Sequence, residues 1–261
     1  MLTRKQIEIL ARRFGVGLSV QERDYIQYIF LYLLFKNSQD FYFKGGTCLK
    51  VVYGLPRYSE DLDFNSNLAG EDIFKRLKDA TNELETFGME GVMRGEKFLR
   101  SGFTFDLSFG GVRYNGRDKT KNKIRVDVSM RKEKGKREEK IIYPRDLYPD
   151  IPTFSLSCLS LEDIFAEKIR ALLMRNKPRD LWDVWFLLER KKKVDISLIN
   201  KKLNLYNLKF DCDGLVKSIE KLERFWKEDL SVLLAPGQLP EFKMVKEKTV
   251  NYFSKITSEK I

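Results

Sequence analysis

The sequence predicts an α+β protein in which an α/β half is followed by a helical half. Residues 97–129 carry apolar side chains at alternating positions, as strands do. Almost all of the chain after Ser160 follows the spacing of helices instead, and the composition changes near 158–160. We therefore expect two domains, an α/β domain at 1–158 and a helical domain at 159–261.

The α/β half is expected to open with two helices. Ser19 and Glu22 have the spacing of a capping box, with Ser19 as N-cap of the second helix. The expected elements of this half are helices up to 14, over 20–36, 47–53 and 70–87, and strands over 41–43, 61–64, 97–109, 124–130, 141–143 and 154–156. The segment 131–140 is charged on every side, which favours a mobile or solvated hairpin loop.

The helical half is read from its apolar periodicity. The expected helices cover 161–175, 179–191, 196–203, about 213–233 and about 240–258. The longest apolar stretch of the whole chain, 28–35, is too short to span a bilayer, and the charged N-terminus does not resemble a secretory signal. Three widely spaced cysteines give no disulfide or zinc pattern. We expect a cytoplasmic protein with no membrane partner.

Two features of the composition restrict the chemistry. The sequence contains no histidine, which excludes Ser–His–Asp catalysis and His-ligated zinc. A metal would then be held by carboxylates, which favours Mg²⁺ or Mn²⁺. The net charge of +11, from 49 Lys and Arg against 38 Asp and Glu, favours a polyanionic partner such as RNA.

An acidic pair, Asp61 and Asp63, is the leading candidate for a metal site. Residues two apart on a strand point to the same face, so a divalent cation would relieve the repulsion of the two carboxylates. Such a pair suits phosphoryl transfer, although acidic pairs on exposed strands are also common. Ahead of it, Gly45, Gly46 and Thr47 follow a strand and open a helix, so they could present N–H groups and a hydroxyl to a phosphate, or form a plain turn.

The segment Gly-Gly-Thr-Cys-Leu (45–49) with Tyr-Gly-Leu-Pro-Arg-Tyr-Ser-Glu-Asp-Leu-Asp-Phe (53–64) resembles the AbiEii/MenT group of nucleotidyltransferase toxins. This group belongs to the DNA-polymerase-β-like nucleotidyltransferase superfamily. The resemblance covers most of the chain, because later motifs also appear in order. It implies a mixed sheet followed by a C-terminal helical domain. Thr47 departs from the usual serine, and the gap to Asp61 is longer than usual in the superfamily.

A third carboxylate is expected on a neighbouring strand. Asp127 alternates with apolar residues and shares a strand face with Arg125, which replaces the lysine of the family's lysine-x-aspartate motif. Asp106 lies in a similar strand and competes for the same role. The flanking basic residue and the order along the chain favour Asp127, and for either residue a solvent-facing strand acid is the structural alternative.

Two further motifs lie in the helical half. Asp163 and Lys168 resemble the family's aspartate-x₄-lysine motif, and we expect Lys168 to be free to reach a triphosphate. The segment from Arg179 to Asp183 resembles the R-D-x-x-D motif, with Asp180 and Asp183 on one helix face. Helix-start acids are also common caps, and the sequence leaves open which of these two is essential.

The resemblance assigns roles to these residues. Metal ligands are Asp61, Asp63 and Asp127; catalytic residues are these three with Lys168 and Asp180; nucleotide-binding residues are Gly45, Gly46, Thr47, Arg57, Ser59, Lys168, Arg179 and Asp183. It implies Mg²⁺-dependent addition of a nucleotide from an NTP to an RNA 3′ end, the tRNA acceptor end, by a toxin that a cognate antitoxin or its operon restrains. The nucleotide would lie between the two domains.

Three other functions remain alternatives to this one. They are an NTP- or GTP-binding toxin without transfer, a kinase-like phosphotransferase acting on a protein partner, and a non-catalytic RNA-binding module.

Overall fold

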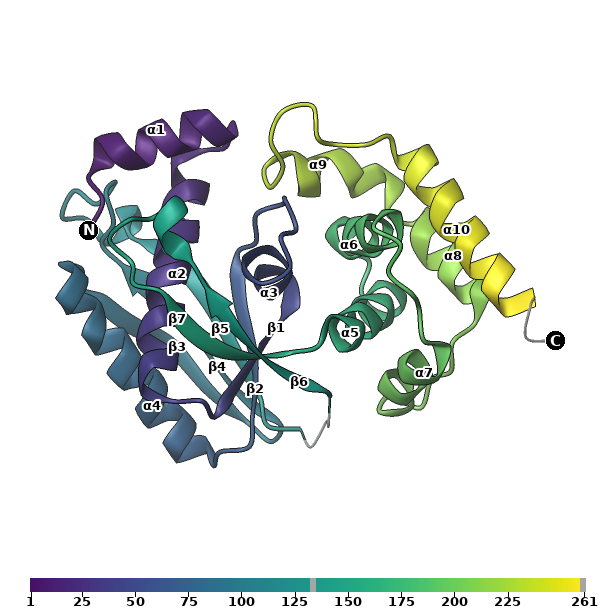
Figure 1. The fold of residues 1–261 in the computed structure, drawn as a ribbon, viewed down its shortest axis with the longest axis horizontal. Helices are drawn as coiled ribbons and strands as arrows, with labels where there is room; N and C mark the ends of the chain where they lie inside the picture. Colours follow the sequence, from purple (N-terminus) through teal and green to yellow (C-terminus); the bar gives the residue numbers. More distant parts are fainter. Residues whose placement is uncertain (132–134, 259–261) are drawn as a thin grey trace. The chain divides into compact units, whose positions relative to one another are not determined.

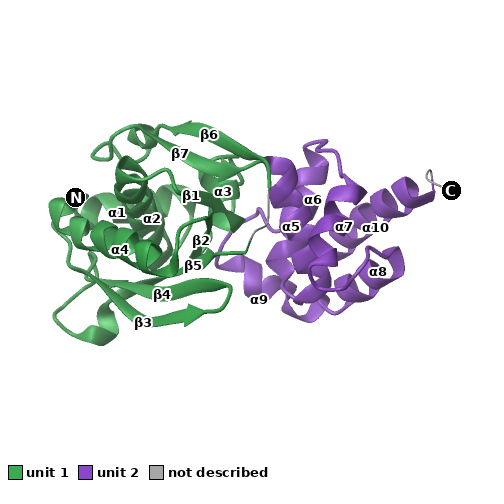
Figure 2. Cartoon of the chain, turned by 90° about the horizontal axis from the view of Figure 1, so that it is seen from below, with its two compact units in different colours: residues 1–160 green, residues 161–261 purple. Residues whose placement is uncertain are grey.

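The structure is a computed structural model that describes residues 1–131 and 135–258. The chain divides into two compact units, Met1–Ser160 and Leu161–Ile261 (Figure 2). The first unit contains a sheet with its helices, and the second contains helices (Figure 1). No helix in the described ranges is both long and apolar enough to cross a membrane.

Unit 1 is built on one mixed sheet. Its strands are β1 (Phe41–Lys44), β2 (Asp61–Ser66), β3 (Gly91–Leu99), β4 (Gly102–Phe109), β5 (Asn122–Ser129), β6 (Arg137–Ile142) and β7 (Phe154–Leu159). Among the described residues they form a seven-stranded sheet in the order β3-β4-β5-β2-β1-β7-β6. The pairs β2/β5 and β1/β7 are parallel and the others antiparallel, so the prediction of an α+β fold with a mixed sheet is confirmed.

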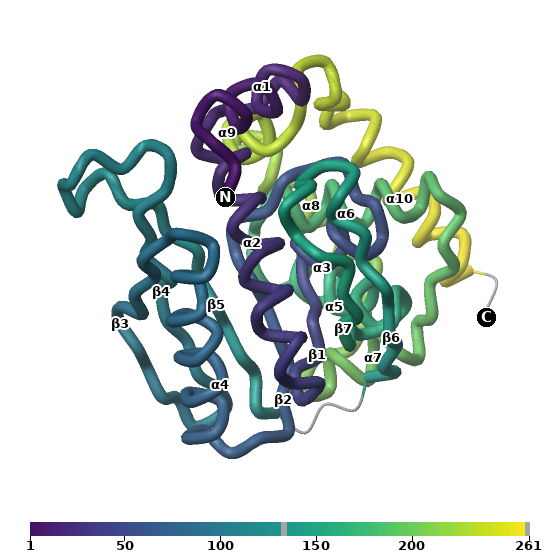
Figure 3. The backbone as a smooth tube through the Cα atoms, turned by 60° about the vertical axis from the view of Figure 1, so that its left-hand side comes forward, coloured from purple at the N-terminus to yellow at the C-terminus, as the bar shows by residue number. Residues whose placement is uncertain are grey.

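The helices of unit 1 pack mainly on one side of this sheet. They are α1 (Arg4–Phe14), α2 (Leu18–Asn37), α3 (Gly45–Val51) and α4 (Gly70–Asn82), with 3-10 turns at Glu83–Phe87, Asp118–Thr120 and Pro144–Asp146. Helix α2 contacts β5 and β7, and α4 contacts β3 and β4 (Figures 1 and 3). The strand side chains that meet them are buried, notably Phe103, Phe105 and Leu107 of β4. Alternation then directs the polar side chains of the same strands to the opposite face.

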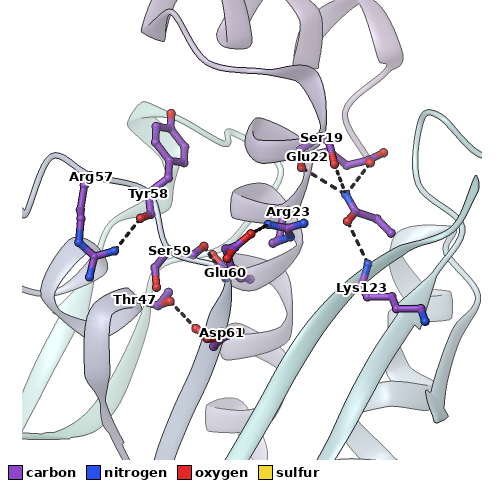
Figure 4. Close-up of polar contacts among 12 residues, drawn as sticks. Ser19, Glu22, Arg23, Thr47, Arg57, Tyr58, Ser59, Glu60, Asp61 and Lys123 are labelled. Carbon is purple, nitrogen blue, oxygen red and sulfur yellow. Dashed lines mark hydrogen bonds and ion pairs between the residues drawn. The ribbon is translucent and has the colours of Figure 1, made fainter. Parts of the chain in front are cut away.

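The predicted capping box at the start of α2 is wrong. The helix begins at Leu18, and its N-cap is Gly17, which makes no side-chain cap. Asn122 at the start of β5 instead donates to the Ser19 carbonyl at 3.2 Å, the Ser19 hydroxyl at 3.3 Å and the Glu22 carboxylate at 3.0 Å (Figure 4). The side chains of Ser19 and Glu22, which the local pattern assigns to the helix N-cap, therefore accept hydrogen bonds from Asn122 of β5 instead.

Other expected boundaries shift as well. The expected helix over 70–87 ends at Asn82 and continues as the 3-10 turn Glu83–Phe87. Of the charged segment 131–140, residues 132–134 lie outside the described residues, and residues from Arg137 onward belong to β6 rather than to a loop. Residues 110–121, which connect β4 to β5, project beyond the strands (Figure 3).

Unit 2 is helical, as predicted. Its helices are α5 (Leu161–Met174), α6 (Pro178–Glu189), α7 (Ile196–Asn204), α8 (Cys212–Glu220), α9 (Trp226–Ser231) and α10 (Phe242–Ser258). The single helix expected over 213–233 is divided by a 3-10 turn, Glu223–Phe225. The change of direction buries Trp226, whose indole N–H donates to the Pro240 carbonyl at 2.9 Å.

Candidate functional site

The acidic pair lies on the sheet face opposite α2 and α4. Asp61 and Asp63 are half-buried and alternate with the buried Leu62 and Phe64 of β2. The parallel pairing with β5 sets Asp63 beside Asp127 and Asp61 beside Arg125. We call the face that carries these four polar side chains the acid face.

The sheet order separates the two candidates for the third carboxylate. Strand β5, which carries Asp127, pairs directly with β2, whereas β4, which carries Asp106, lies one strand further away. Asp127 is in register with Asp63. Asp106 is instead opposite Arg125, whose Nη1 donates to Asp106 Oδ1 at 2.9 Å. Asp106 therefore acts as the partner of Arg125, and Asp127 is the acid next to the pair.

Asp127 is held by two neighbours on the acid face. The Thr104 hydroxyl, buried on β4, donates to Asp127 Oδ1, and Arg125 Nε lies 3.6 Å from the same oxygen. The hydrogen bond to Asp106, helped by the charges of Asp127 and Asp61, raises the pKa of the Arg125 guanidinium above its ordinary value. Thr104 carries no charge and belongs to no motif, so no sequence pattern predicts its role.

The Gly-Gly turn between β1 and α3 lies directly against the acidic pair. Gly45 has a φ of +78°, and a Cβ at this position would come within 2.1 Å of Asp63 Oδ2. A Cβ at Gly46 would lie 2.7 Å from Arg57 Nη2 and 2.9 Å from Ser59 Oγ. The two glycines are needed because the backbone approaches the acid and the Arg-x-Ser segment so closely. The structure thus brings together the predicted residues 45, 46, 57, 59 and 63.

Thr47 and Arg57 have defined partners within unit 1. Thr47 Oγ1 donates to the Asp61 carbonyl, and Arg57 Nη1 donates to the Tyr58 carbonyl at 2.9 Å (Figure 4). Arg57 is only 1% exposed. The threonine hydroxyl therefore fixes the start of β2, and the guanidinium places a buried positive charge beside the Gly-Gly turn. Their contact with a phosphate stays a prediction.

Helices α2 and α3 hold this turn in place through residues that the sequence analysis did not select. Lys50 of α3 forms an ion pair of 2.7 Å with the buried Asp24 of α2, and its ammonium lies 4.7 Å from the centre of the Tyr58 ring. Gln27 donates to the Ser59 carbonyl at 3.1 Å. Because these partners are distant in sequence, no local pattern predicts them.

The Gly45 contact leads to a testable expectation. Replacing Gly45 by alanine should cost roughly 1–3 kcal/mol of stability for the positive φ and should also displace the Asp63 carboxylate. We therefore expect at least about a ten-fold loss of the activity that depends on the acidic pair, because small displacements of a reacting group have effects of this size. Gly17→Ala is the matched control, because a Cβ there meets nothing within 4 Å and φ is negative. Equal activity of the two variants would contradict the role assigned to Gly45.

The donor set of the acid face fits a hard divalent cation. Asp61 and Asp63 offer carboxylate oxygens from one strand face, which is what Mg²⁺ and Mn²⁺ prefer. Asp127 is the candidate third carboxylate, from the neighbouring strand. In the part of the chain that the structure describes, no three Cys, Asp or Glu side chains are grouped closely enough to enclose an ion. Asp127 Oδ1 accepts from the Thr104 hydroxyl.

In unit 2 the predicted motif residues form a buried ion cluster. Lys168 Nζ of α5 lies 3.1 Å from Asp180 Oδ1 and 2.8 Å from Asp183 Oδ2, both on α6. Both aspartates are fully buried and Lys168 is 6% exposed. Arg175 adds a second cation, with Nε 2.8 Å from Asp180 Oδ2. The expectation that Lys168 is free is therefore wrong, because its ammonium joins α5 to the first two turns of α6.

The remaining motif residues of unit 2 also have structural partners. The backbone N–H of Arg179 donates to Asp229 Oδ2 at 3.2 Å, near the start of α6. Asp163 lies 3.0 Å from Lys202 Nζ of α7, and Glu167 lies 3.6 Å from the same ammonium. Asp163 is thus part of a second ion cluster that fastens α7 to α5.

The buried Asp180 makes stability depend on pH. Burial raises the pKa of this carboxyl, but the charges of Lys168 and Arg175 outweigh burial and lower the pKa from 3.8 to about 2. Because the pKa of Asp180 is lower in the folded than in the unfolded protein, its ionised carboxylate stabilises the fold by about 2 kcal/mol above pH 4. This stabilisation is lost as the pH falls from about 4 to 2. Denaturant titrations at a series of pH values should show this loss for the wild type and a flatter profile for Asp180→Asn.

Comparison with known families agrees with this arrangement. The family model described as nucleotidyl transferase AbiEii toxin, type IV TA system, matches residues 30–249. The chain belongs to the AbiEii family. It is accordingly a nucleotidyltransferase toxin of a type IV toxin–antitoxin system, and the resemblance read from residues 45–64 is confirmed. Membership implies an NTP as substrate and an antitoxin as partner.

Solved structures show the same fold as this AbiEii toxin. MenT4, a nucleotidyltransferase toxin from Mycobacterium tuberculosis H37Rv, superposes with a TM-score of 0.70 at 16% identity, covering 98% of this chain and 90% of that one. A proposed nucleotidyltransferase from H. pylori gives 0.58 at 18% identity, with 93% and 95% covered. JHP933 from Helicobacter pylori gives 0.54 at 17% identity, with 94% and 100% covered. No curated protein matches in sequence.

Proposed function

We propose that this AbiEii toxin transfers a nucleoside monophosphate from an NTP to the 3′-hydroxyl of an RNA, the tRNA acceptor end, in a reaction that requires Mg²⁺ or Mn²⁺. The observation that carries the proposal is the acid face, where Asp61 and Asp63 share one strand face and Asp127 lies in register on the next strand. Two-metal phosphoryl transfer uses carboxylates in this kind of arrangement.

The bond changes are those of nucleotidyl transfer. The RNA 3′-oxygen attacks the α-phosphorus, the bond from this phosphorus to the bridging oxygen of the β-phosphate breaks, and pyrophosphate leaves. The proton of the 3′-hydroxyl passes to a base, for which Asp127 is the candidate. A bound divalent ion would neutralise the triphosphate and lower the pKa of the attacking hydroxyl.

The residues of unit 1 would bind and orient the reactants. Asp61 and Asp63 would hold the ion. The backbone N–H groups of the Gly45–Gly46 turn, beside the buried Arg57 charge, would bind the triphosphate. Arg125, anchored by Asp106, supplies positive charge beside Asp127 and limits the repulsion among the acids.

RNA as acceptor is supported by charge. The chain carries +11, and Arg113, Arg117 and Lys119 are exposed in the connection between β4 and β5. A cation-rich loop next to the strand of Asp127 suits phosphate contacts. A cognate antitoxin, acting on the protein or through its operon, would restrain the activity.

In unit 2, Lys168, Asp180, Asp183 and Arg179 stay candidates for a part in the reaction. The buried ion pairs of Lys168, Asp180 and Asp183 support a positioning role first, since Lys168 already neutralises two carboxylates. Contact of Lys168 with a triphosphate would require it to leave these partners.

Labelled nucleotides distinguish this function from its rivals. We expect purified protein with total tRNA, Mg²⁺ and each α-labelled triphosphate to label RNA, and chelation of the metal to abolish the label. Label from a γ-phosphate in protein would identify a kinase instead. If neither tRNA nor any other RNA acquires label with Mg²⁺ or Mn²⁺, the proposal is wrong.

A further inference from the structure

The edge strand β3 contains a bulge that directs two cations to the acid face. Its register with β4 pairs Arg94 with Asp106 and Lys97 with Thr104, with an irregularity between them. Three residues of β3 thus span the space that two residues of β4 span, which defines a β-bulge. Gly95, inside the bulge, has a φ of +63°, and a Cβ there would meet nothing within 4 Å. The glycine is thus required by the backbone conformation rather than by space.

The bulge changes where these side chains point. In a regular strand, residues three apart lie on opposite faces, so either Arg94 or Lys97 would face α4. With the bulge, both lie opposite residues of β4 that belong to the acid face. Lys123, two residues before Arg125 on β5, shares that face. We call Arg94, Lys97 and Lys123 the cation track.

The track is in register with the acidic residues. One row across the sheet runs Lys97, Thr104, Asp127, Asp63, and the neighbouring row runs Arg94, Asp106, Arg125, Asp61. Three strand spacings of about 4.8 Å separate β3 from β2, roughly 14 Å. This distance corresponds to about four stacked nucleotides at ~3.4 Å each. The track therefore lies a few nucleotides from Asp61 and Asp63.

The charges of the track are available at the surface. Arg94, Lys97 and Lys123 are exposed. Arg94 Nη2 lies 3.2 Å from Asp118 Oδ2. Both side chains are about half exposed or more, and ion pairs this exposed contribute little to stability. The acid opposite Arg94 on β4, Asp106, is already bound to Arg125, while Glu96 lies within the bulge outside the register pairs. A phosphate can replace a surface carboxylate as the partner of Arg94.

We infer that the cation track binds the phosphate backbone of the acceptor RNA a few nucleotides upstream of the 3′ end, and that the β3 bulge exists to aim Arg94 and Lys97 at it. This inference deepens the proposed function, on which it rests. Contacts from the track to backbone phosphates give sequence-independent affinity, because the phosphates are the same for every base. The base at the 3′ end must then be recognised elsewhere.

Direct binding tests the track separately from transfer. We expect Arg94→Ala/Lys97→Ala to raise the Kd for a single-stranded RNA of about eight nucleotides roughly ten-fold, and to lower the slope of log Kd against log salt by about 1.4. A trinucleotide, too short to reach β3 from Asp63, should show a clearly smaller loss. The matched control is Lys75→Ala/Lys78→Ala, two exposed lysines of α4 on the opposite side of the sheet, which should leave both values unchanged.

The outcomes separate the two proposals. The inference about the cation track is wrong if the Arg94→Ala/Lys97→Ala variant binds RNA as tightly as the α4 control. It is also wrong if this variant loses the same affinity for the short and the long RNA. Lys97→Glu alone, at an exposed position, gives a second measurement if the double variant unfolds, and unchanged affinity would again overturn it. Absence of nucleotide transfer by the wild type would refute the proposed function instead, whatever the binding results are.

Discussion

Asp61→Asn is expected to lower the rate of nucleotide transfer by roughly a thousand-fold while the protein stays folded. Asparagine keeps the size of the side chain but removes the negative charge that would hold a divalent ion, and an ion of this kind contributes several kcal/mol to stabilisation of the transition state. Asp61 is half-buried on the acid face, and relief from repulsion by Asp63 should leave stability equal or slightly higher. Asp63→Asn should behave alike.

Rates of label transfer to RNA, measured beside thermal unfolding, test this expectation. Asp79→Asn is the matched control, since Asp79 is an exposed acid of α4 on the other side of the sheet. Asp106→Asn should have a smaller effect, about ten-fold, because it loosens Arg125 without removing a proposed ligand. Undiminished transfer by Asp61→Asn would remove the acid pair from the mechanism.

The parts of the site that sequence could predict are those set by short-range periodicity. The alternation of Asp61, Leu62, Asp63 and Phe64 places both acids on one face, and the structure has β2 in that orientation. The Gly-Gly turn can be predicted because glycine is enriched where the backbone needs positive φ, as Gly45 does. The flanking basic residue and chain order favour Asp127 over Asp106, and the β2/β5 pairing sets Asp127 beside Asp63.

The parts that sequence could not predict depend on partners distant along the chain. Ser19 has every local mark of a helix N-cap, yet Asn122, about a hundred residues away, takes its hydroxyl. The bulge at Gly95 breaks the alternation on which strand prediction relies, so the sequence pattern predicts a strand only from 97, whereas β3 begins at Gly91. The sequence predicts a free Lys168 because nothing local shows that its two aspartate partners, on the next helix, lie within reach of the ammonium.

Removal of one charge from the Lys168 cluster is expected to destabilise unit 2 strongly. Asp180→Ala leaves Lys168 with one partner fewer in a buried setting, and breaking a buried ion pair in this way costs about 3–5 kcal/mol. For a unit of this size the thermal transition should fall by more than about 10 °C. Asp213→Ala, an exposed first-turn acid of α8, is the control, with an expected loss below about 1 kcal/mol.

Replacing the whole cluster separates a structural role from a chemical one. The triple variant Lys168→Met/Asp180→Leu/Asp183→Leu removes the ammonium together with both of its carboxylate partners, so none of these three charges is left buried without a partner. Apolar packing should then restore much of the stability that Asp180→Ala loses. If the cluster only fastens α5 to α6, this variant regains transfer together with its thermal transition. If Lys168 or an aspartate contacts the nucleotide, the variant folds but transfers at a rate near that of Asp61→Asn. A variant that neither refolds nor transfers would show that the cluster determines how α5 and α6 pack, a role that apolar side chains of similar volume cannot supply.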